Sequence, residues 1–471
     1  MDRSGAPGRR CGDTGSPIST RRQLLRSLAI VGTALLSAAC AQSASQTVSR
    51  TAASTITSRS SSARTAPAGK RTALNVYYWG SLAEQQCYKA LHAGFEQAHP
   101  SITLQMNPGV GGVPYYQKLE AMAAGGTTPD VFRLAPNWFA SLAAKQLPAT
   151  LDPYVAADKF PLKQYWSALV QSWRYNGKLL SMPEIGNVLV LLYNVDLFKK
   201  AGVTDPNTAD AAKQWTWSAF VAAAQRLTQG NGATKQFGCS FITAIQQLLP
   251  WIWSAGGRLF ADDAHPTKLD MSDPHTVAAF QWLADLLNKY RVAPPPSYTA
   301  TISPNVLFYT GRLGMYATLT DLGTVRQQIN GKFNWDVGPL PAGPAGHVNF
   351  AGGAGWALAN TSRVHDQGWL VLAYIASKPG QEQYVSRQLE IPVLKTLATG
   401  AWLKLSPPPV HRQPILAALH EARPIPKSPQ MLQLAAQAIN PELDLLWSGK
   451  VDAKTAMAAI DQKGNGLLHQ S

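Results

Sequence analysis

The chain has 471 residues, which is too long for one compact core and favours two or more domains. A hydrophobic content of 45% with 15% charged residues describes an ordinary globular protein and excludes a disordered or fibrous one. The formal net charge is +15, but residues 1–73 hold eleven Lys and Arg against two Asp, so +9 lies there and +6 in the rest. No long Lys/Arg cluster follows, and nucleic-acid binding is therefore not expected.

The N-terminus carries an export signal. Arginines precede a short apolar run over 27–39, which ends in small residues before Cys40. This pattern predicts a signal peptide over 1–39, since the run is shorter than the roughly 20 apolar residues that span a bilayer. Arg21 and Arg22 resemble the twin-arginine export motif, and an ordinary basic n-region remains the alternative.

The residues around Cys40 predict a lipid anchor. Ser37 to Cys40 resemble the lipobox of bacterial lipoproteins, in which the Cys becomes the lipidated first residue. Residues 41–73 are rich in Ser, Thr and Ala with few large apolar side chains, which predicts a disordered tether over 40–73. We therefore expect an exported protein that is anchored on the outer face of the cytoplasmic membrane, or is periplasmic.

Strands and helices alternate at the start of the body. Strands are predicted over 74–79, 102–106 and 130–134, and helices over 82–98 and 115–124. This order predicts an α/β layer with a largely parallel sheet. Further strands are expected over 189–193 and 237–241 and helices over 217–227 and 276–290. Beyond residue 360 the pattern is mainly helical, with helices expected over 367–377, 381–389, 430–439 and 454–460.

Motifs for catalysis are not complete anywhere in the sequence. His420 and Glu421 begin a zinc-protease pattern whose second His is missing, and the nucleophile-elbow pattern around Ser240 ends in Ile242 in place of Gly. Phosphate-loop, dinucleotide-binding and metal-ligand spacings are also absent, so no metal and no cofactor are expected. A carbohydrate-active enzyme stays open, because two carboxylates need no motif. An adhesion or sensory lipoprotein is a further alternative.

Aromatic residues favour a sugar ligand. The chain has fourteen Trp, and indole faces stack on the apolar C–H faces of sugars. Trp79 ends the first predicted strand, and ligands of open α/β sheets bind at the carboxyl ends of strands. Each of the other Trp, taken alone, is more often a core residue than a ligand contact.

The ordered sequence blocks resemble the extracellular solute-binding proteins of ABC importers, in the group that binds maltose and other oligosaccharides. The blocks are Tyr116 to Leu119 with Pro129 to Val131, Tyr175 to Leu179 with Leu192 to Asn194, Ala255 to Gly257, Phe308 to Met315, Gly352 to Leu358, and Ile391 to Val393. The resemblance covers 74–471 and implies a periplasmic-binding-protein-like fold of type II. It implies a protein that is not an enzyme, works as a monomer, captures a sugar or oligosaccharide between two lobes and delivers it to a membrane permease.

The resemblance also implies a division of the chain. One lobe is expected to comprise 74–188 and 318–361, and the other 189–317 and 362–471, with crossovers near Asn187, Ala317 and Thr361. Cys87 and Cys239 then lie in different lobes, so two free, mostly buried thiols are predicted.

Ligand-binding residues are carried over from the family position by position. They are Trp79, Gly80, Asn137, Asn187, Trp251, Trp253, Asp321, Gly352 and Gly353. Asn137 and Asn187 stand where the family often has acids, so the expected site is less negative, and a glycerol-3-phosphate-like or other polar solute is an alternative ligand. Asp321 has the alternative role of a helix N-cap.

Overall fold

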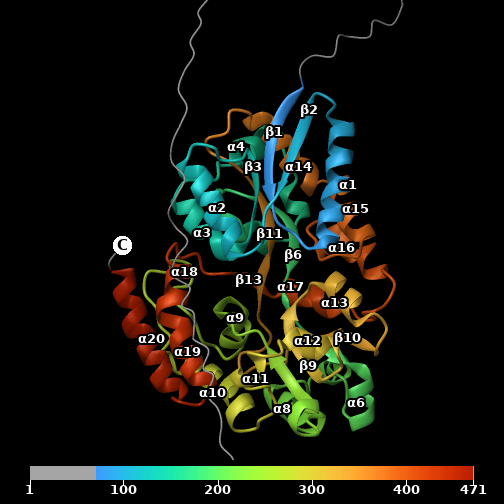
Figure 1. Ribbon diagram of the computed structural model, residues 1–471, viewed down its shortest axis with the longest axis vertical. Coiled ribbons are helices and arrows are strands. Elements are labelled where there is room, and N and C mark those ends of the chain that lie inside the picture. Colours follow the sequence, from blue (N-terminus) through green and yellow to red (C-terminus); the bar gives the residue numbers. More distant parts are fainter. Residues whose placement is uncertain (1–70, 470–471) are drawn as a thin grey trace, which may run out of the picture. The chain divides into compact units, whose positions relative to one another are not determined.

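The computed structural model describes residues 71–469, in which two β-sheets carry the helices of two lobes (Figure 1). The first sheet has the order β12-β6-β11-β3-β1-β2 with β13 paired to β11, and the second has the order β10-β7-β9-β8. The first-sheet strands are β1 (Thr72–Tyr78), β2 (Ile102–Pro108), β3 (Val131–Leu134), β6 (Met182–Asn187), β11 (Asn349–Leu358), β12 (Ile391–Pro392) and β13 (Ala422–Pro424). The second-sheet strands are β7 (Leu189–Asn194), β8 (Phe237–Phe241), β9 (Leu313–Leu319) and β10 (Trp335–Gly338), and β4 (Arg174–Tyr175) pairs with β5 (Lys178–Leu179) as a separate hairpin.

Helices surround both sheets. Those of the first lobe are α1 (Leu82–Ala98), α2 (Val113–Ala124), α3 (Pro136–Ala144), α4 (Asp152–Ala157), α5 (Ser167–Ser172), α14 (His365–Ala376), α15 (Lys378–Ser386) and α16 (Lys395–Thr399). Those of the second lobe are α6 (Val195–Ala201), α7 (Pro206–Ala211), α8 (Trp217–Leu227), α9 (Ile245–Ser254), α10 (Pro274–Asn288), α11 (Pro296–Thr299), α12 (Pro304–Tyr309), α18 (Met431–Leu434), α19 (Asn440–Trp447) and α20 (Ala453–Leu468). Helices α13 (Leu322–Ile329) and α17 (Gln413–His420) lie where the lobes meet.

The first sheet is mixed. Its β1 pairs in parallel with β2 and β3, as the alternation of strands and helices predicts, while β11 runs antiparallel to β3 and β6. Local signals set the boundaries of α1: the Ser81 hydroxyl accepts from the Glu84 N–H, and the Glu84 carboxylate accepts from the Ser81 N–H. This capping box satisfies backbone donors that the first helical turn leaves free.

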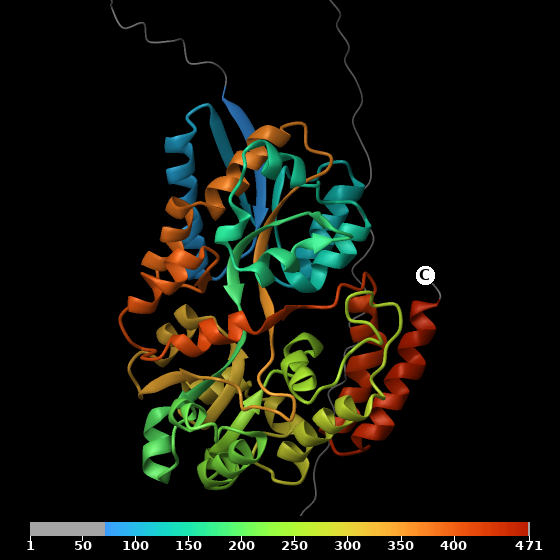
Figure 2. The same cartoon turned by 180° about the vertical axis from the view of Figure 1, so that it is seen from behind.

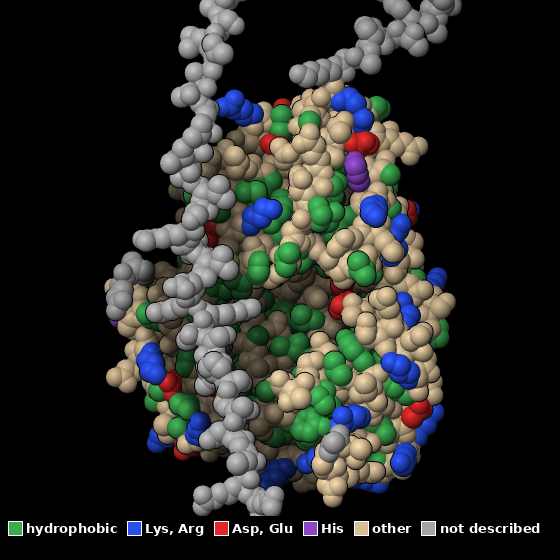
Figure 3. Space-filling model, viewed as in Figure 1, with side chains coloured by type: hydrophobic (Ala, Val, Ile, Leu, Met, Phe, Trp, Pro, Cys, Tyr) green, Lys and Arg blue, Asp and Glu red, His purple; other side chains and the backbone are tan. Residues whose placement is uncertain are grey.

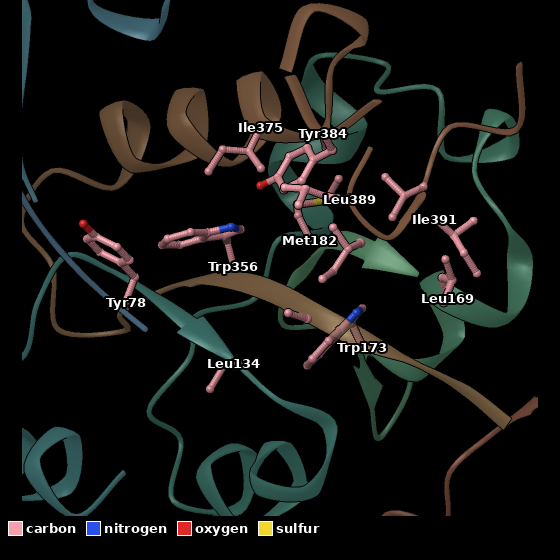
Figure 4. Close-up of a cluster of buried hydrophobic side chains, with 14 of the residues drawn as sticks. Tyr78, Leu134, Leu169, Trp173, Met182, Trp356, Ile375, Tyr384, Leu389 and Ile391 are labelled. Atoms are coloured by element: carbon pink, nitrogen blue, oxygen red, sulfur yellow. The ribbon is translucent and has the colours of Figure 1, made fainter. Parts of the chain in front are cut away.

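The core of the first lobe is built around β11 (Figure 4). Trp356 lies beside Tyr78, with ring centroids 6.4 Å apart, and Trp173 lies across the strand from it. Gly355 makes room for this packing, because a Cβ at that position would lie 2.8 Å from Trp173 Cε2. A side chain there would therefore displace the buried indole.

Both faces of the second sheet are buried. On β7, Leu189, Leu191 and Tyr193 belong to one hydrophobic cluster, and Val190 and Leu192 belong to the other, which continues into the first lobe. Successive residues of a strand point to opposite faces, so a sheet buried on both sides produces an unbroken apolar run. This explains why 189–193 reads as a strand from the sequence alone.

The division between the lobes differs from the expected one after residue 318. Strand β10 pairs with β7 in the second sheet, and the chain reaches the first sheet with β11, so the second transition follows Gly338 and not Ala317. Helix α14 then packs on β6 and β11 and buries Trp369 and Leu372, so 365–405 stays with the first lobe. The chain returns to the second lobe only at α17, which contacts β7, β10 and β11 (Figure 2).

Cys87 and Cys239 are both free and buried, and they belong to different hydrophobic clusters, which confirms the prediction of two free thiols. Over residues 71–469, no helix is long and apolar enough to span a membrane. The predicted signal peptide, Cys40 and the tether up to residue 70 lie outside the described residues. The expected tether over 40–73 is two residues too long, because β1 already begins at Thr72.

Candidate ligand-binding cleft

A cleft of about 320 Å³ lies between the two lobes, where strands of the lobes end and helices begin. Figure 3 shows a hollow at this level with hydrophobic side chains on both rims. The cleft is lined by Ala135, Pro136, Asn137, Asn187, Ala244, Ile245, Gln246, Gln247, Leu319, Phe350, Gly352, Gly353, Ile425, Met431, Leu432, Ala435 and Asn440. Four of the predicted site residues, Asn137, Asn187, Gly352 and Gly353, are therefore brought together.

The lining of the cleft contains no ionisable side chain. Its polar groups are carboxamides, and those of Asn137, Gln246, Gln247 and Asn440 form no hydrogen bond with any residue in 71–469. A carboxamide can both donate and accept hydrogen bonds. These groups can therefore pair with hydroxyl groups, which also do both.

Two helices begin at the cleft, one from each lobe. Helix α3 starts with Pro136 and Asn137 after β3, and α9 starts with Ile245 and Gln246 after β8. Neither start is capped by a side chain. Backbone N–H groups in the first turn of a helix lack intrahelical partners, so both starts offer donors to a ligand.

Backbone geometry places Gly352 and Gly353 beside the crossing strand. Their partners in β6 are Asn187 and Gly186. Gly353 has a φ of 130°, and a Cβ there would lie 2.0 Å from the Ile185 carbonyl oxygen. Only glycine fits this close approach between strands.

Trp79 and Gly80 lie at the end of β1 but do not line the cleft. The Trp79 indole packs on Tyr115 and Tyr116, with centroids 4.9 and 5.8 Å away, and the Arg133 guanidinium lies 4.5 Å from it. Gly80 packs closely on Tyr88. Both residues therefore support the end of the strand, next to a buried charge network.

This network joins Arg133 to two carboxylates. Arg133 Nη2 lies 2.7 Å from Glu84 Oε1, and its Nε lies 2.7 Å from Glu184 Oε2. Burial raises the pKa of Glu184 even though Arg133 opposes this, whereas at Glu84 the charge of Arg133 and the Ser81 hydrogen bonds outweigh burial and lower the pKa. The network holds α1, β3 and β6 together and offers no free cation to a ligand.

Trp251 and Trp253, predicted as stacking residues, lie in the core. Their exposed fractions are 1% and 3%, and the Trp253 indole donates to Asp263 over 3.0 Å. They belong to the buried C-terminal part of α9, whereas the N-terminal part of the same helix lines the cleft.

Asp321 is the N-cap of a helix, which is the alternative role that the sequence analysis gave it. Its Oδ1 accepts from the Thr324 N–H over 3.2 Å at the start of α13, and burial raises its pKa. Gln246, Gln247, Phe350 and Asn440 were not predicted as site residues. The pair of Gln at the start of an otherwise apolar helix could have indicated two of them, but nothing local marks Asn440, which comes from α19.

The model of the family of bacterial extracellular solute-binding proteins matches residues 79–382. Among curated relatives, the sn-glycerol-3-phosphate-binding periplasmic protein UgpB of Brucella melitensis is 26% identical over 331 residues, 66% of this chain and 72% of the relative. The substrate-binding protein Lmo0181 of Listeria monocytogenes, solved with cycloalternan, superposes with a TM-score of 0.75 at 23% identity, over 85% of this chain and 99% of its own.

Maltose-bound MalE3 of T. maritima gives a TM-score of 0.68 at 21% identity, over 84% of this chain and 100% of its own. These likenesses establish the two-lobed fold of periplasmic binding proteins. With the family match over more than half of its length, the chain belongs to the bacterial extracellular solute-binding proteins of ABC importers.

Proposed function

We propose that this protein captures a neutral oligosaccharide in the cleft between its lobes and delivers it to an ABC permease. The observation that carries the proposal is the lining of the cleft, which combines free carboxamides, uncapped helix starts and apolar surface without an ionisable group. Sugar hydroxyls pair with amides, and sugar C–H faces pack on apolar side chains such as Phe350.

The same lining bears on the alternative ligand and argues against the enzymatic alternative. A glycerol phosphate would find no Lys, Arg or His in the cleft, so its phosphate would have to bond the free N–H groups at the starts of α3 and α9. A glycosidase needs two carboxyl groups on either side of the scissile bond, and the cleft has no Asp or Glu. The glycerol phosphate binder among the relatives supports this polar solute as the second candidate ligand, and the binding panel therefore includes it.

Capture would work through closure of the lobes. Asn137 belongs to the first lobe and Gln246 and Gln247 to the second, so a ligand that bonds all of them stabilises the closed form over the open one. We further propose that Cys40 is lipidated and that the body is held at the outer face of the cytoplasmic membrane, as the sequence around Cys40 indicates.

The test uses a panel of neutral oligosaccharides and sn-glycerol 3-phosphate. Binding of each compound is measured by the thermal stabilisation of the protein and by calorimetry. We expect oligosaccharides alone to raise the melting temperature, without being consumed. Replacing Asn137 with Ala should weaken the binding about five- to tenfold, near 1 kcal/mol for one hydrogen-bonding group. Asn360→Ala, at an exposed Asn in the loop after β11, is the control and should leave affinity unchanged. Stabilisation by glycerol phosphate alone would contradict the proposal, and hydrolysis of the sugar would replace it with an enzymatic one.

A further inference from the structure

A larger cavity, of about 880 Å³, lies on the second lobe and shares no lining residue with the cleft. It is bounded by α6 and the segment that follows it, by β10 with the end of α13, and by residues 407–411, which lead into α17 (Figure 1). Small-molecule sites in proteins have volumes of about 300–1,000 Å³. The cavity is therefore large enough to hold an organic ligand.

Two cationic side chains line this cavity without a carboxylate partner. Arg326 donates through Nε and Nη2 to one acceptor, the Pro408 carbonyl oxygen, over 3.2 and 3.0 Å. Its Nη1 has no hydrogen-bond partner between residues 71 and 469 and is not a buried atom, so its N–H groups are accessible to a ligand. Lys199, an exposed residue in the last turn of α6, forms no hydrogen bond or ion pair within the same range. Both side chains can therefore donate to an anion.

The carboxylates of the lining, in contrast, are already bonded within the protein. Asp205 caps α7, where it accepts from the N–H groups of Asn207 and Thr208 and from the Thr208 hydroxyl. The buried Asp336 accepts from the His411 N–H over 3.0 Å and pairs with His411 Nδ1 over 2.6 Å. Neither carboxylate pairs with the two free cations.

A third cation adds positive charge behind the wall of the cavity. Arg412 is 2% exposed, and its guanidinium donates to backbone carbonyl oxygens and to no carboxylate of residues 71–469. Burial and the charge of Arg326 lower the pKa of Arg412 to about 10, and Asp336 opposes this, so Arg412 is still charged at neutral pH. Three cations therefore stand against two carboxylates around the cavity, and a bound anion would offset the excess.

The rest of the lining suits an apolar ring. Phe333 is partly exposed, and Val195, Val203 and Val410 add aliphatic surface. Since Nη1 is the one guanidinium nitrogen of Arg326 that is free, this residue does not offer the two-nitrogen fork that holds a phosphate. A monoanion such as a carboxylate therefore fits the available donors better than a phosphate dianion.

We propose that this cavity is a second small-molecule site, which binds an aromatic carboxylate. The carboxylate would accept from Arg326 Nη1, with Lys199 as the second cation of the site, and the ring would pack on Phe333 and the valines. This inference does not depend on the identity of the cleft ligand, because the two sites have separate linings.

The test is titration of the full chain with benzoate, with benzyl alcohol as the uncharged probe that carries the same ring. Binding is measured by calorimetry and by saturation-transfer NMR. We expect saturable binding of benzoate below ~10 mM, and at least fivefold weaker binding of the alcohol. Lys199→Gln should weaken benzoate binding about two- to fivefold. Lys200→Gln, at the next and equally exposed residue of α6, is the matched control, because Lys200 does not line the cavity.

Two further variants test the charge at the site. Arg326→Gln should weaken benzoate binding at least fivefold, and its melting temperature shows whether it is folded. Val410 is 67% exposed and lines the cavity, so Val410→Glu should repel benzoate and weaken its binding at least tenfold without disturbing the core, whereas Val410→Gln should not.

Lack of saturable binding of benzoate would overturn the proposal. So would equal affinity for benzoate and benzyl alcohol, equal losses in K199Q and K200Q, or equal affinity of V410E and V410Q. Each of these results would put the probe elsewhere or show that the charge of the site does not bind it.

Discussion

Oδ1 of Asn187 accepts hydrogen bonds from both the backbone N–H and the hydroxyl of Thr320, over 2.7 and 2.6 Å. Asn187 is the last residue of β6 in the first sheet, and Thr320 directly follows β9 in the second. One side chain therefore joins two segments that leave different sheets, and the same residue lines the cleft. Its role is to fix the crossing at the ligand site.

Replacing Asn187 with Ala should lower the free energy of unfolding by about 1–3 kcal/mol, because the N–H and hydroxyl of the fully buried Thr320 lose their acceptor. Urea unfolding measures the change. Asn187→Asp keeps an acceptor oxygen in place and should retain more than half of the lost stability. Equal losses in the two variants would show that the pair with Thr320 does not stabilise the crossing.

Trp79→Ala should lower stability by about 2 kcal/mol, since the partly buried indole packs on Tyr115, Tyr116 and Arg133. Trp79→Phe keeps an aromatic ring there and should recover most of the loss. The sequence also predicts that W79A weakens ligand binding by more than about 1 kcal/mol, whereas the position of Trp79 outside the lining of the cleft predicts unchanged affinity. Calorimetry on the folded variant measures this separately, and unchanged affinity would remove Trp79 from the binding site.

Elements with local signals could be predicted closely. The helices expected over 82–98 and 217–227 have those limits as α1 and α8, because Ser81 and Thr216 cap their first turns. Strand β11 could not be predicted from periodicity, since its Gly-rich sequence lacks strand formers at the crossing. Its extended form comes from pairing with β3 and β6, which are distant in the sequence.

The candidate site was partly predictable, because some of its residues lie next to strand ends that the sequence indicates locally. Asn187 ends β6, and Asn137 lies in the first turn of α3, three residues after the end of β3; strand ends meet at the cleft whatever the details of the helices. In α9 the two Gln of the first turn were the local signal for the face at the cleft, whereas the following residues are apolar up to Trp253 and lie in the core. Asn440 reaches the cleft only through the packing of the C-terminal helices.

The thiols of Cys87 and Cys239 should be unreactive in the native protein. Both are buried, and burial raises the pKa of each thiol, which suppresses the reactive thiolate. A thiol reagent applied to protein produced without residues 1–40 should find no reactive thiol before denaturation and two after it. Cys239→Ala should reduce the second number to one. Fewer than two thiols in the denatured, unreduced protein would indicate oxidation or modification.

Glu390 is a buried carboxylate that forms no ion pair with any residue from 71 to 469. It is 6% exposed, and its Oε2 has no hydrogen-bond partner within the described range 71–469. Burial raises its pKa well above the usual range, the charges of Glu84 and Asp321 raise it further, and its own backbone and Arg133 oppose this. The folded protein therefore holds this proton more tightly than the unfolded chain does. By linkage, stability falls as the pH rises from the unfolded carboxyl range, near ~4.3, through the folded pKa.

Glu390→Gln should remove this pH-dependent loss, because a carboxamide of the same shape does not ionise. The variant should be more stable than the unaltered protein at pH 8, and its advantage should shrink at pH 5, where Glu390 holds its proton in the folded state. Urea unfolding at the two pH values measures the difference. Glu382→Gln, at an exposed position of α15 paired only with Lys378, is the control and should change stability little at either pH. An advantage of equal size at pH 5 and pH 8 would mean that Glu390 does not titrate in this range, and that any gain comes from a hydrogen bond of the new amide.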